Sequence, residues 1–174
     1  MAEATSQMTS MMPRALDDLY AEYHGTVFAA AYRVTGSAAD AEDVLHTVFL
    51  RLLKQGEAAQ LNNPEGYLRR AAVNAALDVV RMRRGADVDL DRMPSRGRGV
   101  MDQLQNDDLK RQIRTALAEL PERTAEVFVL RHFEGHKNPE IARMLGISQI
   151  AVAVTLHRAR KKLQDTLRKA GVQQ

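Results

Sequence analysis

The stretch NPEIARMLGISQIAVAVTLHRARKK, residues 138–162, constrains the fold of this chain more than any other. Asn138 is a good helix N-cap, and Pro139 after it suits the first turn of a helix. Gly146 can take the positive φ that ends a helix, and Ser148 can cap the next one. The stretch therefore predicts two helices joined by a tight turn. This geometry can place the second helix in a DNA major groove.

The second predicted helix carries its apolar and its basic side chains on different faces. The apolar face consists of Val152, Leu156, Ala159 and Leu163. The basic face consists of His157, Arg158, Arg160, Lys161 and Lys162. A helical hairpin inside a bundle, with these basic residues simply facing water, is the alternative interpretation of the same pattern.

The composition favours a helical protein with an aliphatic core. Hydrophobic residues make up 45% of the chain and aromatic residues 5%, with no Trp. The net charge of +3 is compatible with nucleic-acid binding but decides little by itself. The absence of Cys excludes disulfides, thiolate nucleophiles and Cys-ligated zinc.

The distribution of charge is more informative than the total. Residues 1–66 hold four basic and nine acidic residues, whereas residues 67–84 hold five Arg and one Asp. A second basic zone lies in the last predicted helix. Two basic zones predict two contacts with one polyanion, and the acidic first part predicts a protein partner or a solvated face. The Arg-rich end of residues 67–84 equally suits a helix C-terminus, where cations complement the dipole.

The apolar periodicity predicts helices throughout and no strand, so the expected fold class is all-α. The expected organisation is two small helical domains joined by a flexible linker, the second with the helix-turn-helix. The expected segments are a disordered tail over residues 1–12, a domain over 13–84 with helices at 13–34, 37–54 and 64–84, a linker over 85–106, and a domain over 107–170.

No pattern predicts catalysis, so we expect neither an enzyme nor a cofactor. His132 and His136 flank Glu134, but Gly135 breaks the helix between them, and the spacing differs from H-E-x-x-H. A metal site is therefore not predicted. No signal peptide and no membrane-spanning run is recognised, which predicts a cytoplasmic protein without membrane insertion.

Three blocks of this chain resemble the extracytoplasmic-function (ECF) sigma factors of the sigma-70 family. DAEDVLHTVFLRLL, residues 40–53, resembles the family block D-A-E-D-L-V-Q-E-V-F-L-R-L. PEGYLRRAAVNAALDVVRMRR, residues 64–84, resembles the block Y-L-R-R-I-A-R-N-L-A-L-D. The stretch from LAELPERTAEVFVLRHFEGHKNPEIARMLGIS to LHRARKKL, residues 117–163, resembles the C-terminal block of the family.

The resemblance implies a subunit that binds core RNA polymerase and directs it to specific promoters, with an anti-sigma factor as a further partner. It implies that core polymerase binds Asp43, His46, Thr47, Phe49 and Leu53. It implies that the promoter −10 element contacts Gln60, Asn62, Asn63, Tyr67, Arg70 and Asn74. It implies that the −35 element contacts Gln149, Thr155, His157, Arg158 and Arg160.

The chain departs from the family pattern at three places. His46 and Thr47 replace a usual Gln-Glu pair, and Val73 replaces a usual Arg. The recognition helix is apolar at Ile150, Ala151, Ala153 and Val154, followed by Thr155. Such side chains can touch thymine methyl groups but donate no hydrogen bonds to base edges.

These departures leave two alternative functions open. One is a degenerate sigma-like protein that acts through protein–protein interaction, with the apolar surface around residues 150–154 as its contact patch. The other is a conventional helix-turn-helix transcription regulator that binds duplex DNA without polymerase.

Overall fold

The computed structural model describes residues 2–56, 58–83 and 107–171. Over these ranges the chain forms seven α-helices and one short 3-10 helix, with no strand, which confirms the predicted all-α class. The predicted linker over 85–106 lies outside the described residues. By length and composition, no single described helix could cross a membrane, and only one bent pair of helices, Asn138–Leu145 with Gln149–Lys169, meets that test.

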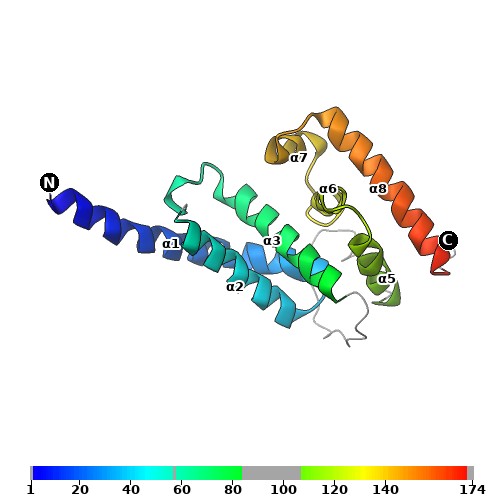
Figure 1. Ribbon diagram of the computed structural model, residues 1–174, viewed down its shortest axis with the longest axis horizontal. Coiled ribbons are helices and arrows are strands. Elements are labelled where there is room, and N and C mark those ends of the chain that lie inside the picture. The colour runs from blue at the N-terminus through cyan, green and yellow to red at the C-terminus, as the bar shows by residue number, and fades with distance from the viewer. Residues whose placement is uncertain (1, 57, 84–106, 172–174) are drawn as a thin grey trace.

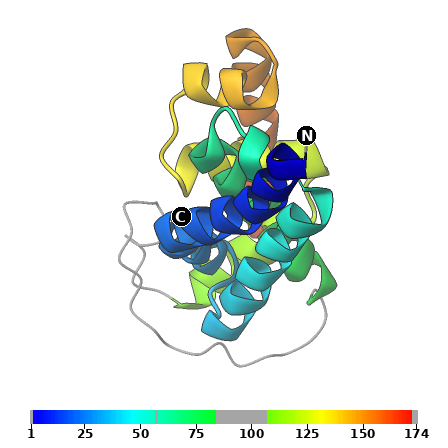
Figure 2. The same cartoon turned by 90° about the vertical axis from the view of Figure 1, so that its left-hand side faces the viewer.

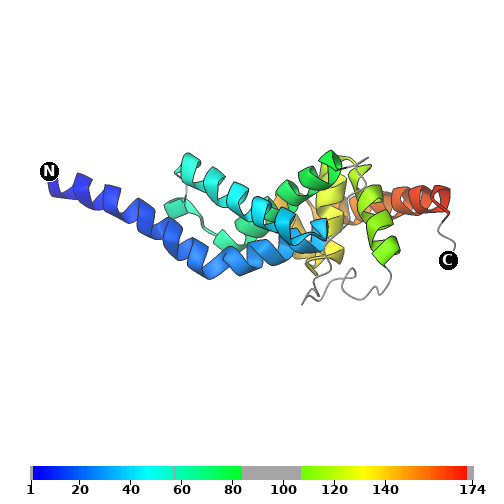
Figure 3. The same cartoon turned by 90° about the horizontal axis from the view of Figure 1, so that it is seen from below.

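The first half of the chain is a three-helix bundle (Figure 1). Its helices are α1 (Ala2–Thr35), α2 (Ala38–Gln55) and α3 (Pro64–Met82), with the 3-10 helix η1 (Ala58–Gln60) before α3. The N-terminal turns of α1 extend beyond α2 and α3, as Figures 1 and 3 show. The predicted disordered tail over residues 1–12 is therefore wrong for Ala2 onward. The stretch contains no Gly and many good helix formers, so its local propensity permits a helix.

Local side-chain caps fix where α2 and α3 begin. Ser37 caps α2, where its hydroxyl oxygen accepts a hydrogen bond from the Asp40 backbone N–H at 3.3 Å. Asn63 caps α3 in the same way, with its Oδ1 3.0 Å from the Gly66 backbone N. Each cap satisfies one of the N–H groups that a helix start leaves without a partner.

The second half contains α5 (Asp107–Ala118), α6 (Glu122–His132), α7 (Asn138–Leu145) and α8 (Gln149–Lys169). Helices α7 and α8 meet at 105°, which is the geometry of a helix-turn-helix. Gly146 makes the turn with φ 62°, and the Ser148 hydroxyl accepts from the Ala151 N–H at 3.1 Å, both as predicted. Asn138 is the first helical residue of α7 and not its cap. The preceding backbone N–H, from Lys137, is bonded instead to the Glu140 carboxylate at 2.6 Å.

The apolar faces of both halves meet in one continuous core. The predicted inner face of α8 is buried, with Val152 and Ala159 fully so. The largest fully buried side chains come from both halves: Leu52, Leu68, Leu77, Leu117, Leu130 and Ile141. In the view along the long axis, Figure 2 shows α7 and α8 (yellow to orange) above the three-helix bundle (blue to green).

The two halves are packed directly against each other, with α3 against both α5 and α6. Arg114 of α5 reaches into the first half, where its Nε donates to the Val34 carbonyl at 3.0 Å. Its guanidinium lies over Gly36, at a point where any Cβ would collide with it. This contact places a cation at the C-terminal end of α1, where the helix dipole favours positive charge.

Candidate nucleic-acid interface

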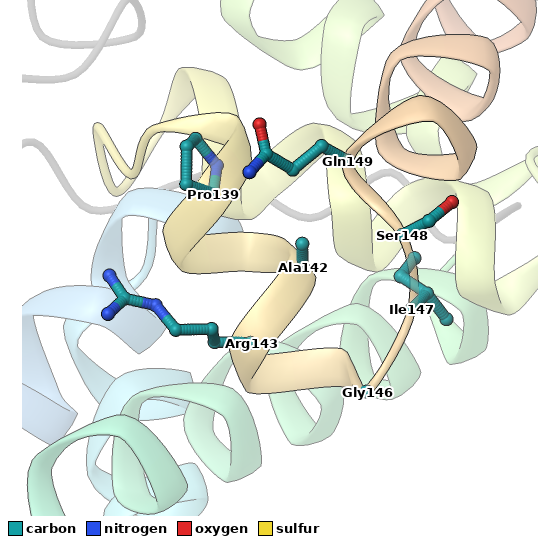
Figure 4. A pocket seen from close by; sticks show the side chains of 7 residues that line it. All are labelled: Pro139, Ala142, Arg143, Gly146, Ile147, Ser148 and Gln149. Carbon is teal, nitrogen blue, oxygen red and sulfur yellow. The ribbon is translucent and has the colours of Figure 1, made fainter.

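The tip of the helix-turn-helix exposes apolar side chains. At the start of α8, Ile150 is 77% exposed and Val154 is 44% exposed. Beside them is a shallow groove of about 600 Å³ between α7 and α8, shown in Figure 4. The residues lining the groove are Pro139, Ala142, Arg143, Gly146, Ile147, Ser148 and Gln149.

The side chains predicted to contact the −35 element divide into two groups. Gln149, His157 and Arg158 are exposed on α8, close to the exposed apolar tip in sequence. Thr155 is half-buried, and its hydroxyl donates to the Ala151 carbonyl at 2.7 Å, so it is already bonded within the helix. Arg160 is exposed but lies near enough to His132 of α6 to affect its pKa, so it flanks the inner side of α8.

The side chains predicted to contact the −10 element also divide into two groups. Gln60, Asn62 and Asn63 are exposed in the segment before α3, and Asn63 is also the cap of that helix. The Tyr67 hydroxyl donates to Oε1 of Gln55 at 3.2 Å. These residues line one accessible end of the three-helix bundle.

Arg70 and Asn74, in contrast, lie against the second half of the protein. Both side chains donate to Oε1 of Glu126 on α6, and the Asn74 Nδ2 does so at 3.0 Å. The side-chain oxygen of Asn74, Oδ1, is buried and has no hydrogen-bond partner. The family resemblance implies that both residues contact DNA. In this structure both side chains instead donate to the Glu126 carboxylate.

Three other Arg side chains of the first basic zone, all within the described residues, are also paired with acids. Arg69 bonds to Glu65 at 2.7 Å and to Glu134 at 3.0 Å. Arg83 bonds to Asp40 at 2.6 Å, and burial is the main reason that the pKa of Asp40 is raised, against the opposing effect of this Arg. Arg81 bonds to Asp78 on its own helix. In this arrangement the described Arg side chains of the zone are therefore paired with carboxylates and do not form a free basic surface.

The outer face of α2 carries four of the five residues predicted to bind polymerase, and Phe49 is the exception. Asp43, His46 and Leu53 are exposed, and Thr47 is half-buried. Phe49, however, is only 7% exposed and packs edge-on against Tyr20, with ring centroids 5.0 Å apart. Phe49 therefore belongs largely to the core.

Leu50, next to Phe49 in the chain, is exposed on the outer face of α2. It is 53% exposed and Leu53 is 57% exposed. The spacing of 46, 50 and 53 follows one helical face, so the period of α2 contained the signal that identifies Leu50. The exposed strip of α2 is thus Asp43, His46, Leu50 and Leu53, which we call the α2 strip.

His132 and His136 do not form a metal site with other residues of the described ranges, where no group of three potential ligands was found. Burial lowers the pKa of both imidazoles. Nearby Arg160 lowers the pKa of His132 further, and nearby Arg69 does the same for His136. The Nε2 atom of each ring is buried without a hydrogen-bond partner.

These two histidines predict that the protein loses stability as the pH falls. Each imidazole has a folded-state pKa below its ordinary value, so between the two values the unfolded chain binds more protons. The free energy of unfolding should therefore be highest above about pH 6.5 and fall below it. Because both rings keep some solvent contact, we expect a loss of about 1 kcal/mol, or about 2–4 °C in Tm, between pH 7.5 and 5.5.

The measurement is thermal unfolding followed by circular dichroism at several pH values. His132→Gln should flatten the dependence, since one of the two groups no longer titrates. Replacement of the exposed His157 by Gln is the matched control and should leave the slope as in the parent. Equal slopes in all three proteins would contradict the assignment.

Two family models match this chain, in the same order as the two halves of the structure. The model "Sigma-70 region 2" matches residues 19–86, and "Sigma-70, region 4" matches residues 110–163. An RNA polymerase sigma-E factor of Streptomyces coelicolor is 30% identical over 79% of this chain and 77% of its own length. CarQ, an RNA polymerase sigma factor of Myxococcus xanthus, is 30% identical over 88% of this chain and 89% of its own length. This chain belongs to the ECF sigma factors of the sigma-70 family.

Other relatives of this sigma factor are longer or more distant. The ECF sigma factor SigE of Mycolicibacterium smegmatis is 31% identical over 88% of this chain, which spans 62% of that relative's length. RpoE of Bartonella quintana, solved with the anti-sigma factor NepR, has TM-score 0.52 and 18% identity, covering 87% of this chain and 96% of its own. CnrH, solved with the cytosolic domain of CnrY, has TM-score 0.52 and 25% identity, covering 94% of each chain.

Proposed function

We propose that this sigma factor binds core RNA polymerase in the cytoplasm and directs it to specific promoters, with no catalysis and no cofactor of its own. The observation that carries the proposal is the pairing of the two matched regions with an exposed helix-turn-helix tip. The three surfaces described above then divide the work between polymerase and the two promoter elements.

The α2 strip is the proposed polymerase contact. Its two exposed leucines supply apolar area, and exposed apolar side chains that water would otherwise surround favour a protein interface. Asp43 and His46 add polar contacts that fix the orientation. In this chain His46 and Thr47 stand where the family has Gln-Glu, so the polar part of the contact differs while the apolar part remains.

The −10 element is proposed to bind at the start of α3. An opened strand exposes unstacked bases, which proteins hold by stacking and by hydrogen bonds to base edges. Gln60, Asn62 and Tyr67 offer amide groups and an aromatic ring on an accessible surface. Arg70 and Asn74 extend this surface along α3 once they are released from Glu126.

The −35 element is proposed to bind the start of α8 in its major groove. Gln149 offers a side-chain amide that can bond bidentately to adenine. Ile150 and Val154 are placed to contact thymine methyl groups, which makes T-rich positions the favoured ones. Arg158, further along the helix, is placed to neutralise a phosphate.

A second protein partner is proposed from the related structures. The Bartonella quintana sigma factor was solved in complex with an anti-sigma factor. We propose that an anti-sigma factor also binds this chain and competes with polymerase for it.

The function is tested with purified core polymerase and a library of genomic promoter fragments. We expect the protein to copurify with core polymerase at micromolar concentration and to yield discrete run-off transcripts. Absence of core binding would disprove the proposal. Specific duplex binding by the isolated protein, without any polymerase-dependent transcript, would instead identify a conventional regulator.

Arg158→Ala should weaken binding of the polymerase complex to promoter duplexes uniformly across sequences, by about 1 kcal/mol or roughly fivefold. The loss of one phosphate contact should also reduce the slope of log K against log salt by about 1. The control is Arg168→Ala, an exposed Arg ten residues further along α8, about 15 Å away. A change confined to a few promoter sequences would show that Arg158 reads bases and not phosphate.

A further inference from the structure

Two acidic side chains, one on α6 and one just after its C-terminal end, bond to side chains of the first half of the molecule. Glu126 is only 3% exposed and accepts from Arg70 and Asn74 of α3. It is also bonded at 3.2 Å to Arg123 on its own helix. A carboxylate so enclosed requires such partners, because an unpaired buried charge is strongly destabilising.

Glu134 repeats this arrangement about two turns further along the chain. Its side chain is fully buried, and its two oxygens bond to Arg33 of α1 at 2.9 Å and to Arg69 of α3 at 3.0 Å. Each carboxylate is therefore clasped by two side chains of the first half. The ion pairs join residues 56 to 101 positions apart in sequence.

We propose that Glu126 and Glu134 act as an intramolecular substitute for promoter DNA, occupying the basic face of α3 in the free protein. The inference rests on the proposed function, since it concerns the same −10 surface. A carboxylate presents to Arg and to the Asn amide the same anionic acceptor oxygens that a phosphate or a base carbonyl presents. DNA and the Glu126 carboxylate consequently exclude each other at Arg70 and Asn74.

The chemistry of the contact makes it exchangeable. A buried ion pair gains little over the hydrated groups, because desolvation offsets most of the Coulombic attraction. The Arg side chains also keep access to water, at 38% for Arg70 and 23% for Arg69, so salt screens them. Exchange of two carboxylates for two DNA anions then replaces each ion pair by another of the same kind. In the closed arrangement α6 lies on α3, and in the open arrangement DNA lies there.

Val73 gives a second indication of this closed arrangement. It lies on the same face of α3 as Arg70 and Asn74 and is fully buried. At this position the chain departs from the Arg that the family pattern has. A valine suits a face that is covered by α6, whereas an Arg there would favour an open face.

The first test measures binding of a fluorescein-labelled 15-nucleotide single-stranded DNA of random sequence to the full-length protein. The double variant Glu126→Gln with Glu134→Gln should bind about tenfold more tightly than the parent. The control replaces two exposed acids of the same half, Glu122 by Gln and Asp165 by Asn, which changes the net charge equally. An equal gain in both double variants would overturn the proposal, because it would show a general charge effect.

The second test follows opening directly and does not depend on the Gln variants folding. The chain has no Cys, so Asp18→Cys and Gln164→Cys on the exposed faces of α1 and α8 provide two unique labelling sites for energy transfer. Rising salt should increase the distance between the labels in the parent, and Val73→Arg should increase it at low salt. An unchanged distance under both conditions would overturn the proposal.

Run-off transcription with core polymerase separates this inference from the proposed function. If the parent yields no transcript and binds no core polymerase, the proposed function fails whatever the labels show. If the parent is active but neither DNA affinity nor label distance responds to the changes, only the role assigned to Glu126 and Glu134 fails.

Discussion

Replacing Leu50 and Leu53 together by Asp should abolish binding to core RNA polymerase, with a loss of at least about 100-fold in affinity. Both side chains are more than half exposed on α2, so their replacement removes little from the core. At an interface, however, each Asp loses an apolar contact and adds a charge that must be desolvated. Fluorescence titration of labelled protein with core polymerase measures the loss.

The matched control for this experiment is Met82→Asp. Met82 is 85% exposed at the end of α3 and is not part of the α2 strip, so the change has the same chemistry without the proposed contact. Circular dichroism should show folded protein for all variants. Equal loss in the control would indicate a general effect of added acid, and full binding by the double variant would move the polymerase contact off α2.

The helix-turn-helix could be predicted from sequence because short-range interactions determine it. Gly146 and Ser148 act within one turn of their own positions, and the inner face of α8 follows a simple helical period. The same holds for the capping residues of α2 and α3. The tail over residues 1–12 was predicted wrongly because weak apolar periodicity was interpreted as disorder, although its residues have good helix propensity.

The contact between the two halves could not be predicted, because it joins residues far apart in sequence. Nothing near Arg70 or Asn74 indicates that Glu126 is their partner. One local signal did exist: Glu126 lies one turn before Leu130, on the face that is otherwise apolar and buried. A lone acid at such a position requires a buried cationic partner, but the sequence does not identify which one.

The burial of Phe49 next to the exposed Leu50 has a different cause. Both residues are apolar and adjacent in sequence. Consecutive side chains of a helix point about 100° apart around its axis, so the two residues lie on different faces. The family pattern led us to choose the aromatic residue, whereas the packing of Phe49 against Tyr20 directs it inward. The position of the next helix decides which of two neighbouring apolar residues is buried, and that position is a tertiary property.

Leu156→Ala should strongly destabilise the second half of the protein. Leu156 is 3% exposed and lies on the inner face of α8, in the middle of the recognition helix. Removing its side chain leaves a cavity that the surrounding helices fill only in part, which costs about 2–5 kcal/mol. Urea unfolding followed by circular dichroism should show a lower midpoint with an unchanged slope.

Leu167→Ala, on the same helix, is the control that separates burial from helix propensity. Leu167 is half-buried at the edge of the same core, so the identical chemical change should cost about half as much or less. If the two variants lose equal stability, Leu156 does not hold α8 in place by its packing. If Leu156→Ala instead lowers only the slope, the two halves unfold separately, and the contact between α3 and α6 is too weak to couple them.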